Sequence, residues 1–140
     1  MIKKILFVFL CAGLIQSCQT EKKSFKGVFF GGQIINPSSR KVTLYQGNKS
    51  LDVFELDENL RFNKSYDSLN SGIFKLEHLP EFQSLLLEEG DSIWVRINAP
   101  TFDESIVYSG SGASKNNFLM ELLLKQEKEN DYLSSKYSSS

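Results

Sequence analysis

The sequence predicts a mainly β fold, an antiparallel β-sandwich or partly open barrel of seven to eight short strands, followed by a C-terminal α-helix. Two patterns predict it. From residue 27, short runs of β-branched and aromatic residues alternate with polar ones at a period of two, separated by turn residues. After residue 112 the apolar residues recur at helical spacing instead. A chain of 140 residues, 41% of them hydrophobic, is enough for one domain with a modest core.

The strand expectations follow the period-two runs between turns. The clearest run is residues 91–98, where Ile93, Val95 and Ile97 face one side and Trp94 the other, the pattern of a half-buried antiparallel strand. The other runs are bounded by Gly, Asn, Pro or Ser and are expected at residues 28–35, 41–46, 51–56, 72–78, 82–88 and 105–108, with one further short strand before the polar loop at 67–72.

One turn of the predicted β-domain has an unfavourable residue. Residues 57–62 are expected to form a tight hairpin that joins the preceding strand to a short partner. Asn59 accepts a left-handed backbone conformation, whereas Leu60 is a poor residue for one.

The helix is expected over residues 112–137, with a frayed tail at 138–140. Ser114 is a plausible N-cap, and Glu121 and Lys125 form a favourable i, i+4 pair. The apolar positions at helical spacing are Phe118, Leu119, Leu122 and Leu123. Beyond Lys125 the helix becomes polar.

The N-terminal residues predict a lipoprotein signal peptide at 1–17. Lys3 and Lys4 precede an apolar run over 5–15 that is about half the length of a membrane-spanning helix. The run ends in Leu14-Ile15-Gln16-Ser17-Cys18, which resembles the bacterial lipobox. The resemblance implies cleavage between Ser17 and Cys18, diacylglyceryl transfer to the Cys18 sulfur, and acylation of the new amino terminus. Residues 18–26 then form a lipid-anchored tether, and residues 27–111 form the β-domain.

Charge and cysteine content exclude two classes of function. The chain has 16 Lys and Arg against 17 Asp and Glu, so it carries no basic excess for nucleic-acid binding. Cys11 lies in the signal peptide and Cys18 becomes a thioether, which leaves the mature chain without a free thiol for redox chemistry. No metal site and no cofactor is expected.

No set of residues points to catalysis. His78 is the single histidine and has no nucleophile at motif spacing, so we expect a structural or surface residue. Gly110-Ser111-Gly112 lacks the Lys of a phosphate loop and is interpreted as a hinge into the helix. The acidic clusters are interpreted as turns and caps in preference to calcium or glycosidase sites, and they are Asp57-Glu58, Glu88-Glu89-Asp91 and Asp103-Glu104.

Two surface features remain as candidate sites. Trp94 and Tyr45 are candidates for an aromatic ligand-binding face, unless the C-terminal helix covers Trp94. Asp67-Ser68-Leu69 resembles the Asp-Ser/Thr-aliphatic sequon for O-glycosylation in Bacteroidetes periplasmic proteins. This makes Ser68, in a polar loop, the candidate acceptor.

Several ordered motifs resemble one family over nearly the whole mature chain. They are Gly32-Gln33-Ile34-Ile35-Asn36-Pro37, Val42-Thr43-Leu44-Tyr45, Leu56-Asp57-Glu58-Asn59-Leu60-Arg61-Phe62, Leu87-Glu88-Glu89-Gly90-Asp91-Ser92-Ile93, Tyr108-Ser109-Gly110-Ser111-Gly112-Ala113 and Asn116-Asn117-Phe118-Leu119. Together they resemble the N-terminal β-domain, of the domain-of-unknown-function type, of Bacteroidetes TlpA-like thioredoxin lipoproteins. The family usually has Gly at the position of Leu60.

The resemblance implies an accessory function. In that family the β-domain precedes a thioredoxin-fold domain with a Cys-x-x-Cys pair that reduces periplasmic disulfides. This chain stops at Ser140 without such a pair, so no catalytic residue is carried over and no enzyme is expected. The chain is expected to be a fragment or a stand-alone relative of such a protein, acting as a lipid-anchored periplasmic module for a thioredoxin-fold domain or another envelope protein.

The alternative is a stand-alone cell-envelope lipoprotein that binds glycan or peptide ligands at Trp94 and Tyr45. In either case Gln19, rather than Asp, follows the acylated cysteine, and the next residues lack the acid-rich pattern of surface export. We therefore expect a lipid-anchored protein that faces the periplasm, and the outer membrane is favoured over the inner membrane as its location.

Overall fold

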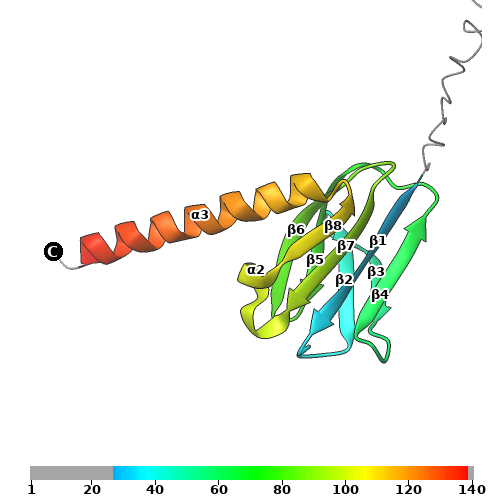
Figure 1. Ribbon diagram of the computed structural model, residues 1–140, viewed down its shortest axis with the longest axis horizontal. Helices are drawn as coiled ribbons and strands as arrows, with labels where there is room; N and C mark the ends of the chain where they lie inside the picture. The colour runs from blue at the N-terminus through cyan, green and yellow to red at the C-terminus, as the bar shows by residue number, and fades with distance from the viewer. Residues whose placement is uncertain (1–26, 139–140) are drawn as a thin grey trace, which may run out of the picture.

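The computed structural model describes residues 27–138, which form a β-sandwich with a long C-terminal helix (Figure 1). The two sheets have four strands each, in the orders β4-β1-β7-β8 and β3-β2-β5-β6. The strands are β1 Val28–Ile35, β2 Lys41–Gln46, β3 Lys49–Glu55, β4 Arg61–Tyr66, β5 Gly72–His78, β6 Glu81–Leu87, β7 Ser92–Asn98 and β8 Val107–Ser111. The predicted mainly β fold with a C-terminal helix is confirmed, and the sheets do not close into a barrel.

The core lies between the sheets because each strand buries alternate residues. In β7 the side chains of Ile93, Val95 and Ile97 are fully buried, as the alternation predicted. Phe30 of β1 packs edge-on against Phe62 of β4, with ring centroids 5.7 Å apart. The outer faces of both sheets therefore carry the residues of opposite parity, which include Tyr45 and Trp94.

Strand pairing departs from the sequence prediction at two places. β1 and β7 run parallel, with Phe30 opposite Ile93, so the antiparallel expectation fails for this pair. The expected hairpin at 57–62 does not join paired strands, because β3 and β4 belong to different sheets and β4 pairs with β1. Leu60 takes the left-handed conformation there, at φ 61°.

The chain between β7 and β8 also differs from the prediction. Ala99–Thr101 form a 3₁₀ turn (η2), and Phe102–Ser105 form a short helix (α2) where a strand was expected from residue 105. Pro100 favours this because its fixed φ suits the first turn of a helix. Phe102 is buried and ties the segment to the core. β8 lies at the edge of its sheet.

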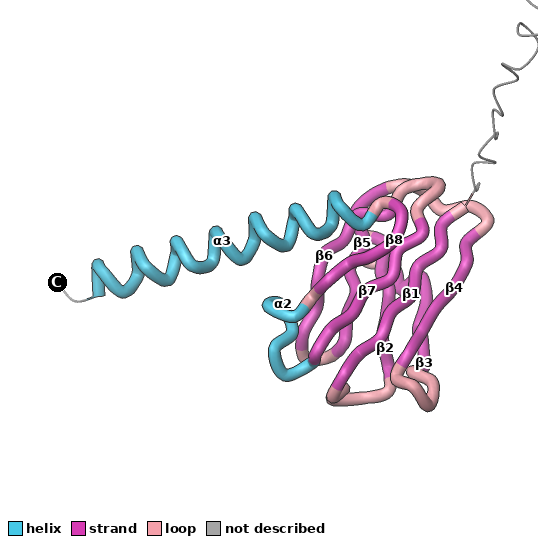
Figure 2. The backbone as a smooth tube through the Cα atoms, viewed as in Figure 1, coloured by secondary structure: helices cyan, strands magenta, loops and turns pink. Residues whose placement is uncertain are grey.

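Helix α3, Ala113–Ser138, begins one residue before the expected N-cap Ser114. Its first turns contact the sandwich, where Ala113, Asn116 and Met120 are buried. From Lys125 onward its described side chains are exposed. Figure 2 shows this part of α3 extending away from both sheets. No helix within residues 27–138 is both long and apolar enough to span a bilayer.

Candidate functional site

Two consecutive asparagines join the start of α3 to both sheets. The Leu86 N–H of β6 donates to Asn116 Oδ1 at 2.7 Å, and Asn116 Nδ2 donates to the Leu86 carbonyl at 2.9 Å. Asn117 makes the same pair of bonds with the Tyr108 backbone of β8, at 2.9 and 2.8 Å. Because β6 and β8 are the edge strands of different sheets, these side chains satisfy both edges and let α3 close one side of the sandwich.

An ion cluster holds the same end of the helix. Lys115 Nζ lies 2.7 Å from the carboxylate of the buried Asp91 and 2.6 Å from that of Glu88. Asp91 also accepts the Glu88 N–H at 2.8 Å. Burial lowers the pKa of Lys115, but the hydrogen bonds to Asp91 and Glu88 and the negative charges of these two residues together outweigh burial and raise this pKa above its usual range. The helix is thereby fixed to the turn before β7.

An apolar groove runs between the root of α3 and the outer face of β5 and β6. Its volume is about 230 Å³. Its residues are almost all apolar, and they are Ile73, Leu85, Leu86, Leu119, Leu122 and Leu123, with Ser84 and Gln126 beside them. Ile73 is 71% exposed, which is high for a large apolar side chain beside other apolar residues.

A second cleft of about 370 Å³ lies nearer the start of β6, between this strand, α2 and α3. Phe82 and Met120 are among its apolar lining residues, and Glu81, Asp103 and Glu127 line it as well. Burial raises the pKa of Asp103, and the nearby charges of Glu127, Glu81 and Glu104 raise it further. Within residues 27–138, no group of three or more His, Cys, Asp or Glu is arranged to hold a metal ion.

The raised pKa of Asp103 gives a pH-dependent prediction. A carboxyl whose pKa is raised by folding favours the protonated form in the folded state, so its ionisation reduces stability as pH rises through the carboxyl range. Asp103→Asn is therefore expected to raise the free energy of unfolding at pH 7 by a few tenths of a kcal/mol, and the gain should vanish near pH 3. Urea unfolding at both pH values measures this, with Asp67→Asn of the exposed β4–β5 loop as the control. A variant less stable than wild type at pH 7 would contradict the assignment.

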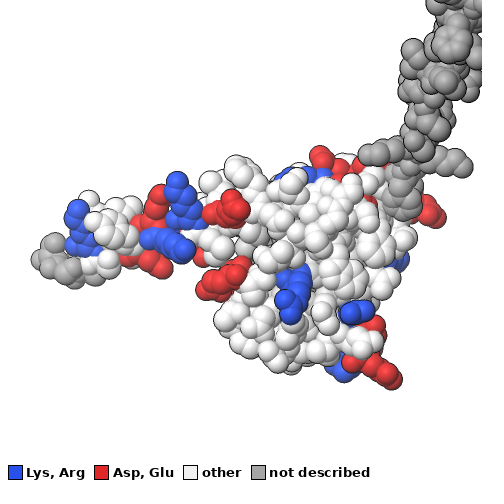
Figure 3. Space-filling model, viewed as in Figure 1, with Lys and Arg blue, Asp and Glu red and all other residues white. Residues whose placement is uncertain are grey.

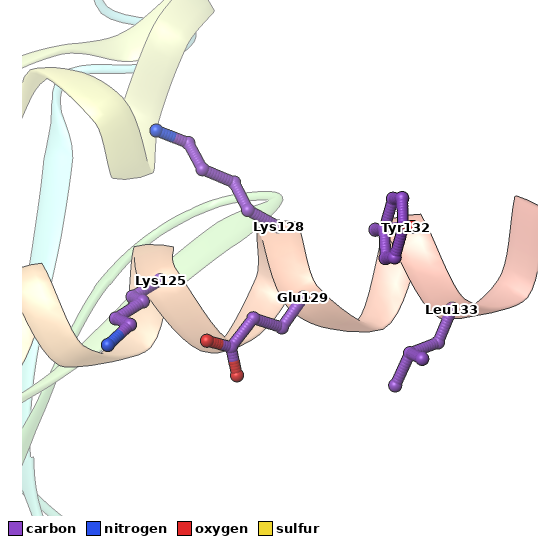
Figure 4. A pocket seen from close by; sticks show the side chains of 5 residues that line it. All are labelled: Lys125, Lys128, Glu129, Tyr132 and Leu133. Carbon is purple, nitrogen blue, oxygen red and sulfur yellow. The ribbon is translucent and has the colours of Figure 1, made fainter.

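The outer half of α3 presents both charged and apolar side chains. A surface hollow of about 420 Å³ is lined by Lys125, Lys128, Glu129, Tyr132 and Leu133. Figure 4 shows that all five come from this one helix, with Lys128 and Tyr132 on one side and Leu133 on the other. It is therefore an open helix surface rather than an enclosed pocket. Figure 3 shows clusters of both charge signs along this part of the helix.

The structure does not bring Trp94 and Tyr45 together. Trp94 lies half-buried on the outer face of β7, and its ring lies over Gly31, where an added Cβ would come within 3.0 Å of it. Tyr45 lies on the outer face of the other sheet, where its hydroxyl donates to Glu77 at 3.1 Å and Lys75 Nζ lies 4.1 Å from its ring centroid. The two residues therefore do not form one ligand-binding face.

Of the other residues that the sequence analysis singled out, some lie within the described part of the chain and some lie outside it. Ser68 is exposed in the β4–β5 loop, where a modifying enzyme could reach it. Ser17 and Cys18, with the signal peptide and the tether, lie outside the described residues. Asp57 accepts the backbone N–H groups of Asn59 and Arg61, both at 2.8 Å, which makes it a turn cap as expected.

His78 meets a serine that sequence spacing did not reveal. Its Nε2 lies 3.1 Å from Ser38 Oγ, and its Nδ1 donates to the Lys41 carbonyl at 3.0 Å. Nε2 already accepts the Ser38 backbone N–H, at 3.1 Å, and the Ser38 hydroxyl donates to the Leu79 carbonyl at 2.5 Å. The base and the hydroxyl proton are both engaged, so this pair ties the β1–β2 turn to β5 instead of activating a nucleophile.

The asparagine pair at 116–117 is the main structural feature that residue-level reasoning missed. The sequence shows two adjacent asparagines at the start of a helix, but helix propensity does not predict that their side chains bind the edges of two sheets. Comparison of the chain with protein-family models, curated proteins and solved structures finds no match.

Proposed function

We propose that this chain is a lipid-anchored accessory domain of the cell envelope, attached through Cys18, whose sandwich holds α3 in place for a protein partner. The observation that supports this most is α3 itself. Its root is fixed by the Asn116 and Asn117 amides, whereas its described side chains from Lys125 onward are exposed. A helix that is rigid at one end and open along the rest is suited to docking.

The position of Gly27, where the described chain begins, also supports the proposal. Gly90 N–H donates to the Gly27 carbonyl at 2.7 Å, at the point where the β-domain begins. Asp91, the next residue, binds Lys115 at the root of α3. One turn therefore connects the start of the sandwich with the start of the helix, so an anchor at Cys18 would also hold α3 near the membrane surface. The family resemblance makes a thioredoxin-fold domain one candidate partner, besides other envelope proteins.

Replacing Cys18 tests the anchor. In a bacterium that lipidates proteins, the full chain is expected to incorporate a clickable palmitate analogue and to fractionate with membranes. Cys18→Ser is expected to lose the label completely, because the acceptor sulfur is gone, and to lose its wild-type membrane retention. Triple acylation gives stable attachment, whereas one chain gives only a marginal one.

Cys11→Ser is the matched control because it changes the other cysteine without removing the acceptor. It should be labelled and retained like wild type. Equal labelling of Cys18→Ser and wild type, or no labelling of wild type, would contradict the lipoprotein assignment.

A further inference from the structure

A regular stripe of residues runs along one face of α3. It consists of Leu119, Leu123, Gln126, Asn130, Leu133 and Tyr137. The positions follow one another at alternating steps of four and three residues, the spacing of the inward-facing positions of a two-stranded coiled coil. The stripe begins in the apolar groove, which Leu119, Leu123 and Gln126 line, and continues along the protruding half of the helix.

The apolar members of the stripe are exposed. Their exposed fractions rise from 37% at Leu119 to 74% at Tyr137. Single exposed apolar side chains are normal, but apolar residues at both ends of one helix face, with one end in an apolar groove, indicate an interaction surface. Ile73 and Leu86 extend this surface onto the sheet.

The stripe has the same chemical order in both directions. Two apolar residues are followed by two amides, Gln126 and Asn130, and then by two apolar residues. If a second α3 lies antiparallel to the first, each of these layers meets a layer of the same kind. Leu123 then meets Leu133 of the second copy, and Gln126 meets its Asn130. Paired amides at the centre satisfy each other and fix the register.

The antiparallel register also fills the groove. It places Tyr137 of the second copy over Leu119, beside Ile73 and Leu86, where an aromatic ring can cover the exposed apolar carbons. A parallel pair would place both sandwiches at one end and leave this groove facing no helix tip. The occupant that fits both the stripe and the groove is therefore another copy of α3.

We propose that α3 pairs in antiparallel orientation with α3 of a second copy of this chain, through the stripe and the groove. The stripe is roughly 28 Å long at the rise of an α-helix. The five further groove residues bring this surface to eleven residues per copy, and the helix positions beside the stripe extend it toward the roughly twenty residues per side of a standard interface. The inference rests on the proposed docking role of α3, and it is independent of the anchor at Cys18.

The register places like charges close to the two-fold axis. Glu127 and Glu129 flank the amide layer, so each lies near its own counterpart in the second copy. Their repulsion weakens pairing at low ionic strength and is screened by salt. Association is therefore expected to strengthen as the salt concentration rises.

Cysteine cross-linking of the full chain tests the pairing. Gln126→Cys and Asn130→Cys are placed on two differently tagged copies that are co-expressed, and the intact cells are oxidised. The disulfide between the two variants (the mixed disulfide) is expected to exceed the disulfide of either variant with itself (the self-disulfide) by about tenfold. In the proposed register, residue 126 lies beside residue 130 of the second copy, whereas residue 126 of one copy and residue 126 of the other are about four residues, roughly 6 Å, apart along the helix axis. The yield should rise between low and high salt. Lys128→Cys, on another face of the helix, and the wild-type chain with Cys11 and Cys18 give the background.

A matched pair of charge substitutions ties the adduct to the stripe. Leu133→Glu is expected to reduce the mixed disulfide about tenfold, whereas the adjacent Tyr132→Glu, which points to the other side of α3, should leave it unchanged. Mixed disulfide at background level, or predominant self-disulfides, would overturn the antiparallel pair. Adducts with other polypeptides alone would also overturn it, while leaving the proposed docking function in place.

Discussion

Replacing Asn116 with alanine is expected to lower the free energy of unfolding by about 3 kcal/mol. The Asn116 carboxamide is almost fully buried and makes two hydrogen bonds to Leu86, one to its N–H and one to its carbonyl. Alanine leaves both backbone groups without their partner beneath the helix. Each unsatisfied buried group costs roughly 1–3 kcal/mol, and the root of α3 loses its attachment to β6.

Urea unfolding of the purified chain, followed by circular dichroism, measures this loss. Asn70→Ala changes an exposed asparagine of the β4–β5 loop and should alter the free energy of unfolding by less than about 0.5 kcal/mol. Asn117→Ala, which removes the equivalent bonds to Tyr108, should destabilise the chain in the same way, although less because Asn117 is only half-buried. If Asn116→Ala were as stable as Asn70→Ala, the amide bonds would not be holding the helix.

Replacing Gly110 with alanine is expected to lower the free energy of unfolding by about 3 kcal/mol or more. Gly110 has φ of 97°, a conformation that a side chain strains by roughly 1–2 kcal/mol. An added Cβ would also overlap the carbonyl oxygen of Ser92 on the neighbouring strand β7. A backbone oxygen in a paired strand cannot move aside as a flexible side chain can, so β8 would have to shift away.

Gly72→Ala is the matched control, because an added Cβ at the start of β5 meets nothing within 4 Å. It should change the free energy of unfolding by less than about 1 kcal/mol. Thermal unfolding of both variants gives the comparison. Equal melting temperatures would show that the β7–β8 pair does not require glycine at position 110.

Much of the architecture could be predicted because it depends on local patterns. The alternation of Ile93, Val95 and Ile97 predicted a half-buried strand, and the change to helical spacing after Gly112 predicted α3. Both patterns report which side of an element is buried. They do not identify the element against which that side packs, and the errors in the prediction concern these packing partners.

The pairing of strands was decided by packing between distant parts of the chain. The segment expected to form a hairpin at 57–62 instead connects the two sheets, with Leu60 in a left-handed conformation that its residue type disfavours. Three backbone bonds stabilise this connection, including Ile34 N–H to the Leu60 carbonyl at 3.0 Å. Tertiary contacts of this kind override the preference of a single residue.

The candidate ligand face failed for the same reason. Tyr45 and Trp94 each lie on the outer side of a strand, which alternation could predict. Whether two outer sides belong to one surface depends on which strands share a sheet, and these two strands do not. The role of Asn116 and Asn117 could not be predicted for a similar reason. Asn116 binds Leu86, which is 30 residues away in the chain, and Asn117 binds Tyr108, which belongs to the other sheet.

The sequence by itself determined that the chain forms half-buried β-strands followed by a helix, because the spacing of apolar residues in each segment is a local property of the sequence. Only the tertiary structure decided which edges the helix closes and which surface it leaves open. Those depend on side-chain amides that reach backbone groups of two separate sheets, and on a groove formed where β5, β6 and α3 meet. Such contacts join residues far apart in the chain, and no local pattern encodes them.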